Sequence, residues 1–131
     1  MARPRIPDVD GVAAVTEARS AGEADRSTVA MAVRYLLQLL AENHAGRSVE
    51  LSEPPFGAVQ IIEGPRHTRG TPPNVVEMPA DVLLALATGD ATWEGSVATG
   101  RIHASGSRSD LRALFPIALP PESTPTTPDA R

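Results

Sequence analysis

The chain has 131 residues and a formal net charge of −4, with 16 acidic and 12 basic residues, and all of the basic residues are arginine. This acidic balance argues against general binding to nucleic acid, which needs a clustered positive surface. The absence of cysteine excludes disulfides, thiolate catalysis and zinc–thiolate sites.

The ends and the longest apolar segment limit the possible architecture. No secretory signal opens the sequence, and the longest apolar segment, residues 29–40, is too short to cross about 30 Å of hydrocarbon. We therefore expect a cytoplasmic protein with no transmembrane segment. Residues 1–7 and 119–131 are rich in proline, charge and hydroxyl groups, so we expect both to be disordered. Residues 8–118 then form a single domain with one hydrophobic core.

Residues 8–45 predict two helices. The first, over residues 8–19, has apolar residues at helical spacing. The second begins after Asp25 or Ser27, either of which can cap it, and ends at about residue 45, where Gly46 supplies a left-handed stop.

The second of these helices is apolar over a wide arc. One face consists of Val29, Val33, Leu36, Leu37 and Leu40. That face is extended by Met31, Tyr35 and Leu39. A helix of this kind is buried either inside its own core or, on one side, by a second subunit. Both alternatives remain open, and the second predicts a homodimer through residues 29–40.

Strand patterns follow the second helix. Residues 47–52 alternate apolar and polar side chains with a period of two, and residues 56–63 are rich in β-branched and aromatic side chains. The loop GPRHTRGTPP, residues 64–73, then leads to a short strand at residues 74–77.

The rest of the domain alternates helices with one more strand. Residues 79–88 predict a helix that begins with proline and ends before a glycine. A short helix over residues 93–99 and a strand over residues 101–106 come next. Residues 110–115 predict a last helix that stops before a proline. This order of elements indicates an α+β domain with a small, largely antiparallel or mixed sheet.

Residues 80–115 resemble the C-terminal half of sterol carrier domains. There, a helix of the form D-x-L-x-x-L-x-x-G leads into a short helix, a glycine-bounded strand and a final amphipathic helix. The matching positions are Asp81, Leu83, Leu86, Gly89, Trp93, Val97, Gly100, Ile102, Gly106, Leu111 and Leu114. The stretch EGPRHTRGTPPNVVE, together with the Ser-Gly after the last strand, is similar to a short single-domain subgroup from actinobacteria called sterol carrier family proteins. The resemblance covers residues 49–115.

This resemblance implies a sheet of about five strands with helices packed on one face and an apolar cavity between them. In relatives such a cavity holds sterols, fatty acids or acyl groups. We expect its walls to come from Leu83, Leu86, Trp93, Val97, Ile102, Leu111 and Leu114. A single tryptophan on a short helix also fits a plain core residue, so that alternative stays open for Trp93.

The loop at residues 64–73 is the best candidate for a polar site. Its glycines and prolines hold Arg66, His67 and Arg69 on a stiff connection. Two guanidinium groups can grip a carboxylate or phosphate in a bidentate fashion, so these residues could bind an anionic head group at the mouth of the cavity. The alternative is a connector in which the arginines pair with local acids.

Nothing in the sequence predicts catalysis or a metal site. His44, His67 and His103 share no metal-ligand spacing, and the serines lack a placed base. Glu50 and Glu53 flank a strand with nothing to mark a raised pKa. We therefore expect no enzyme activity, no metal and no cofactor.

The sequence predicts a non-enzymatic protein that binds an apolar or amphipathic ligand, such as a lipid, fatty acid or acyl compound, in an internal cavity. The alternative is a dimeric interaction or regulatory module with a filled core and no ligand.

Overall fold

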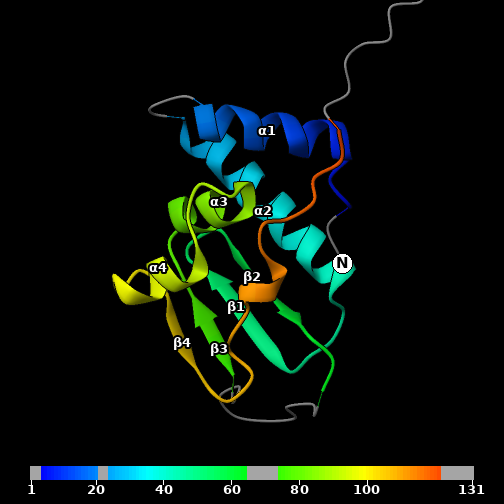
Figure 1. Ribbon diagram of the computed structural model, residues 1–131. Coiled ribbons are helices and arrows are strands. Elements are labelled where there is room, and N and C mark those ends of the chain that lie inside the picture. The colour runs from blue at the N-terminus through cyan, green and yellow to red at the C-terminus, as the bar shows by residue number, and fades with distance from the viewer. Residues whose placement is uncertain (1–3, 21–23, 65–73, 122–131) are drawn as a thin grey trace, which may run out of the picture.

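The computed structural model describes residues 4–20, 24–64 and 74–121. These residues form four α-helices, four strands and one 3₁₀ turn. In chain order they are α1 (Asp8–Ser20), α2 (Arg26–Asn43), β1 (Val49–Glu53), β2 (Gly57–Ile61), β3 (Val75–Glu77), α3 (Ala80–Thr88), α4 (Trp93–Ala98), β4 (His103–Ser105) and η1 (Arg112–Leu114). The helices gather on one side of the sheet, with α1 in the outermost position (Figure 1).

The sheet is mixed, with the strand order β2-β1-β3-β4. β1 pairs with β2 antiparallel and with β3 parallel, and β3 pairs with β4 antiparallel. The α+β class is therefore confirmed. The expected number of strands was about five, whereas the described residues contain four. The loop at 64–73, with Arg66, His67 and Arg69, lies outside the described residues except for Gly64.

The core lies between the sheet and the helices. Alternate residues of β1 point toward the helices, so Val49 and Leu51 are buried there, together with Val76 of β3. Seven residues of α2 are buried by the chain itself: Ala32, Val33, Tyr35, Leu36, Leu37, Leu39 and Leu40. Because α2 contacts α1, α3 and β2, its wide apolar arc lies inside the core. The homodimer through residues 29–40 stays a prediction.

The predicted start of α2 is confirmed, whereas its predicted end is wrong. Asp25 caps the N-terminus as predicted, since its carboxylate accepts a hydrogen bond from the Thr28 N–H at 2.8 Å. The C-terminus was expected near residue 45 with Gly46 as its stop, but the helix ends at Asn43 and His44 is the cap. The reason is tertiary, because the His44 carbonyl accepts a hydrogen bond from the Ile62 N–H at 2.8 Å and draws the chain to the sheet. A Cβ on Gly46 would collide with the backbone of Ile62, so the glycine permits this close approach.

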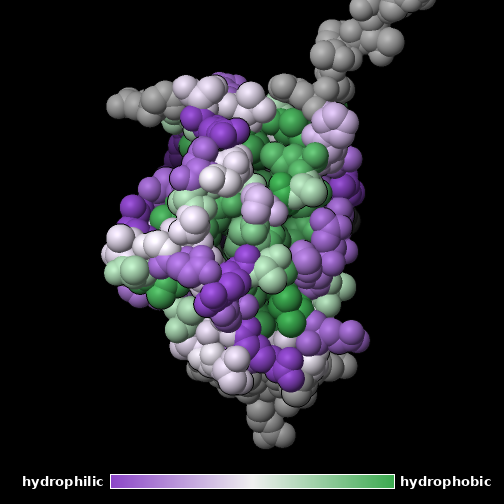
Figure 2. All heavy atoms as spheres, in the orientation of Figure 1, coloured by the Kyte–Doolittle hydropathy of each residue, from purple (hydrophilic) through white to green (hydrophobic). Residues whose placement is uncertain are grey.

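The C-terminal segment runs over the helices after η1 (Figure 1). The helix expected over residues 110–115 is only the 3₁₀ turn of η1. The chain instead extends, so that Phe115 stacks on Trp93 with ring centroids 6.4 Å apart and the Ile117 N–H donates to the Ala87 carbonyl at 2.9 Å. Apolar side chains gather along this face (Figure 2), and Leu119 packs against the core.

The described helices include none that is long and apolar enough to cross a membrane.

Candidate functional site

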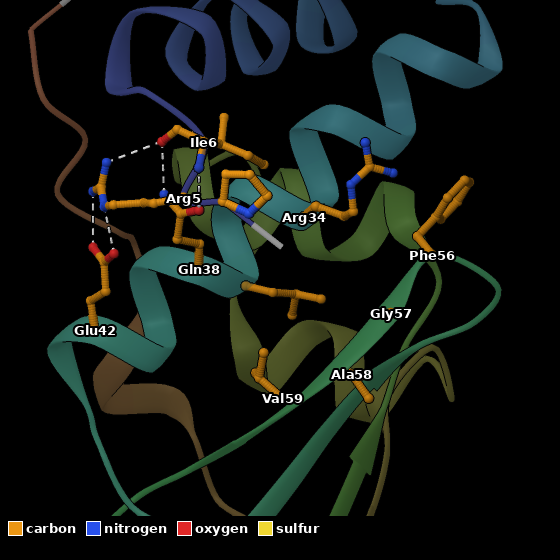
Figure 3. A pocket seen from close by; sticks show the side chains of 11 residues that line it. Arg5, Ile6, Arg34, Gln38, Glu42, Phe56, Gly57, Ala58 and Val59 are labelled. Atoms are coloured by element: carbon orange, nitrogen blue, oxygen red, sulfur yellow. Dashed lines mark hydrogen bonds and ion pairs between the residues drawn. The ribbon is translucent and has the colours of Figure 1, made fainter. Parts of the chain in front are cut away.

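A groove of about 660 Å³ lies between α2 and the edge strand β2. The N-terminal residues Pro4, Arg5 and Ile6 form part of its wall (Figure 3). Its other lining residues are Arg34, Leu37, Gln38, Glu42, Phe56, Gly57, Ala58 and Val59. The groove therefore joins three segments that are far apart in the sequence.

The floor of the groove is apolar. Leu37 of α2 is almost fully buried, and Phe56 and Val59 are half-buried and pack against the core. Leu37 lies over the strand at Gly57, since a Cβ on Gly57 would be in ordinary van der Waals contact with Leu37 Cδ1 at 3.6 Å. This arrangement provides an apolar trough of the size that small-molecule ligands occupy.

Reciprocal hydrogen bonds hold the N-terminal wall against α2. The Ile6 N–H donates to Gln38 Oε1 at 2.8 Å, and Gln38 Nε2 donates to the Ile6 carbonyl at 2.9 Å. The Arg5 guanidinium binds the carboxylate of Glu42 at 2.6 and 2.9 Å.

Residues 1–7 were expected to be disordered. Residues 4–7 are described and two of them are bonded to α2, while residues 1–3 lie outside the described residues.

The two ends of the groove differ in charge. At one end, hydrogen bonds from Arg5 lower the pKa of Glu42. At the other end, Arg34 and Phe56 lie close together (Figure 3), and the guanidinium of Arg26 stacks over the Phe56 ring at 5.2 Å. No carboxylate within the described ranges forms an ion pair with Arg34, whereas six ion-pair contacts are formed elsewhere in them. The Phe56 end is therefore the one able to receive an anionic group.

Glu53 is the most unusual ionisable residue that the structure describes. It is 0% exposed, and neither carboxyl oxygen has a hydrogen-bond partner among the described residues. Burial raises its pKa to about 9, and the negative charges of Asp81 and then Glu77 add to the shift. Glu53 is therefore a neutral carboxylic acid at pH 7.

The raised pKa of Glu53 was not expected from the sequence, in which nothing marked Glu50 or Glu53 as unusual. The signal was present in the period of two along β1. Val49, Leu51 and Glu53 are spaced two residues apart, so a strand that buries the first two also turns Glu53 toward the core.

The residues predicted as cavity walls lie outside the groove between α2 and β2. Core positions are occupied by Leu83, Leu86, Trp93, Ile102 and Leu111. Leu114 is half-buried and Val97 is 43% exposed. None of these seven residues lines the groove. The internal cavity therefore remains a prediction from the family resemblance.

The histidines are separated in the fold. His44 caps α2, and His103 is exposed on β4 opposite Glu77 of β3. His67 lies outside the described residues. Across the described ranges, no three His, Cys, Asp or Glu side chains converge as a metal site would require.

Residues 25–117 match the family model described as "Bacterial SCP ortholog". The chain belongs to this family of sterol carrier protein relatives. The family predicted from residues 49–115 is thus confirmed, and the match extends toward the N-terminus to include α2. The matched region therefore contains α2 and β2, the two elements between which the groove lies. Comparison with curated proteins gives no significant match.

Proposed function

We propose that this sterol carrier protein relative binds an amphipathic lipid-class ligand in the groove between α2 and β2, without catalysing a reaction. The apolar chain of the ligand lies on Leu37, Phe56 and Val59, and its polar end faces the Phe56 end of the groove. The observation that carries this proposal is the apolar floor beside an arginine that has no acidic partner among the described residues.

The physical basis is burial of apolar surface. Each methylene group moved from water onto an apolar floor contributes about 0.8 kcal/mol when it is fully buried, so a chain of ten carbons supplies at most about 8 kcal/mol. Because association and partial burial reduce this free energy, we expect a Kd weaker than about 1 μM. The family supports the same class of ligand, because sterol carrier proteins have a lipid-binding fold.

The wall formed by residues 4–6 gives the groove its third side. Its ion pair between Arg5 and Glu42 is exposed, and exposed ion pairs contribute only about 0–1 kcal/mol. The only other bonds to α2 among the described residues are the two between the Ile6 backbone and Gln38. The wall can therefore detach without unfolding of the core, which provides a route for the ligand to enter and leave.

The test is titration with 11-(dansylamino)undecanoic acid, whose fluorescence rises in an apolar site. We expect saturable binding to the unmodified protein and at least tenfold weaker binding to Val59→Trp, in which the indole fills the floor. Val97→Trp is the matched control, since it makes the same substitution at an exposed position on α4. Unchanged affinity of a folded Val59→Trp variant would reject the groove as the binding site.

A further inference from the structure

Glu53 stands apart from the other buried polar residues that the structure describes. Asn74, for example, uses both ends of its side chain: Nδ2 donates to the Ser48 carbonyl at 2.8 Å, and Oδ1 accepts from the Arg108 N–H at 3.0 Å. The two carboxyl oxygens of Glu53 have neither kind of partner. Buried polar groups are almost always hydrogen-bonded, so Glu53 is an exception whose carboxyl group a polar ligand atom could satisfy.

Glu53 lies on β1, beside the strand that lines the groove. In the antiparallel register of β1 and β2 its partner is Gly57, a lining residue. Directly opposed positions in such a pair have Cβ atoms about 4.5–5.5 Å apart, and the Cβ position of Gly57 is 3.6 Å from Leu37 Cδ1. Leu37 therefore packs on the inner face of the sheet at the position with which Glu53 is paired.

The backbone places Glu53 at the Phe56 end of the groove. The Phe56 N–H donates to the Glu53 carbonyl at 2.7 Å, which closes the turn between β1 and β2. This is the end at which Arg34 lies (Figure 3). Glu53 is thus next to the turn that forms this end of the groove.

We propose that Glu53 is a concealed hydrogen-bonding subsite of the groove and that its ligand is an amphiphile with an uncharged hydroxyl head, such as a long-chain alcohol. A rotation of the Leu37 side chain admits the hydroxyl to the carboxyl group. The hydroxyl then accepts a hydrogen bond from one carboxyl oxygen and donates one to the other. This inference rests on the proposed function and names the ligand class of the same groove.

A hydroxyl suits this position better than a charged group. Burial of any ion without a counter-ion is costly, and an anionic head group would also be repelled by Asp81 and Glu77, whose charges already act on Glu53. A carboxylic acid and an alcohol can satisfy each other's donors and acceptors without either becoming charged. Ligands with charged heads are expected to stay at the solvent-facing rim.

The experiment compares 1-decanol with decyl methyl ether, which has the same chain but no hydroxyl donor. Their affinities are measured by displacement of the dansyl probe. We expect the unmodified protein to prefer the alcohol by about fivefold to tenfold, the effect of one buried hydrogen bond. Glu53→Met should abolish that preference while retaining binding of the ether, and Glu53→Gln should restore part of the preference. Glu50→Met is the matched control on the opposite face of β1, and it should keep the full preference.

Thermal unfolding supplies the second measurement. Glu53→Met is expected to unfold at a higher temperature, because it removes a buried polar group without a partner, while it loses discrimination between the two ligands. Equal affinity of the unmodified protein for alcohol and ether, or a preference that persists in Glu53→Met, overturns the Glu53 subsite alone. Failure of the probe and both ligands to bind the unmodified protein overturns the proposed function and the subsite with it.

Discussion

The phenol ring of Tyr35 fills the space in which a side chain at Gly11 would lie. A Cβ on Gly11 would collide with ring carbons of Tyr35, so only glycine lets α1 approach α2 this closely. Both residues are buried, and the Tyr35 hydroxyl donates to Asp8 at 2.7 Å, one turn earlier on α1. Glycine in a helix interior costs about 1 kcal/mol relative to alanine, and α1 retains it because packing against Tyr35 requires the small residue.

Gly11→Ala should therefore destabilise the protein. Overpacking of a core typically costs about 1–3 kcal/mol, which exceeds the gain in helix propensity of about 1 kcal/mol. The measurement is the free energy of unfolding in urea. Ala13→Gly, at an exposed position of the same helix, should cost no more than about 1 kcal/mol. A Gly11→Ala variant that is more stable than the unmodified protein would contradict the packing of Tyr35 against α1.

Glu53 should make the protein less stable as the pH rises. Its pKa is about 9 in the folded protein and near the ordinary value of 4.5 in the unfolded chain. Between these values the folded state holds a proton that the unfolded state has released. The free energy of unfolding therefore falls with increasing pH through this window, by at most about 1.4 kcal/mol per pH unit from this group.

Urea unfolding at pH 6, 7 and 8 measures this effect. The unmodified protein should lose stability across the series, and Glu53→Gln should lose markedly less. The difference between the two proteins isolates the Glu53 contribution, since all other titrating groups are shared. Parallel pH profiles would show that Glu53 gains a partner or water access in solution.

Trp93 distinguishes the groove from the cavity that the family resemblance implies. It is the only tryptophan in the chain; it packs on Phe115 and does not line the groove. A fatty acid brominated along its chain quenches tryptophan fluorescence only near contact. We expect saturating ligand to leave the Trp93 emission nearly unchanged. Strong quenching would instead support a cavity walled by Leu83, Leu86 and Trp93.

Arg34 should favour ligands with a negative head group. Arg34→Gln is expected to weaken binding of decanoate about threefold and to leave 1-decanol unaffected, because a half-exposed charge contributes less than about 1 kcal/mol. The difference should shrink in 0.5 M salt. Arg47→Gln is the control, since Arg47 also lacks an ion pair with the described acids but lies outside the groove. Equal losses in both variants would indicate a general charge effect.

The local elements of this protein were predictable from short stretches of sequence. The Asp25 cap, the apolar arc of α2 and the end of α3 at Gly89, with its left-handed φ of 85°, each depend on residues within a few turns. The same holds for the glycine and leucine spacing that led to the sterol carrier family. Such features follow from backbone geometry and side-chain periodicity, which the sequence alone specifies.

The groove and Glu53 were decided by the tertiary structure. Ile6, Leu37 and Val59 become neighbours only when α2 packs on β2 and the N-terminal segment bonds to Gln38. Glu53 becomes neutral only because the register of β1 and the covering helices remove it from water. The groove does not depend on nearby sequence, and the period of two along β1 indicates the burial of Glu53 but not its pKa. Ligand grooves and shifted pKa values arise from the surroundings of a residue in space. The sequence determined most of the helices and strands and the family they belong to. Tertiary packing decided where α2 ends, that residues 110–115 form only a 3₁₀ turn, and where the groove lies.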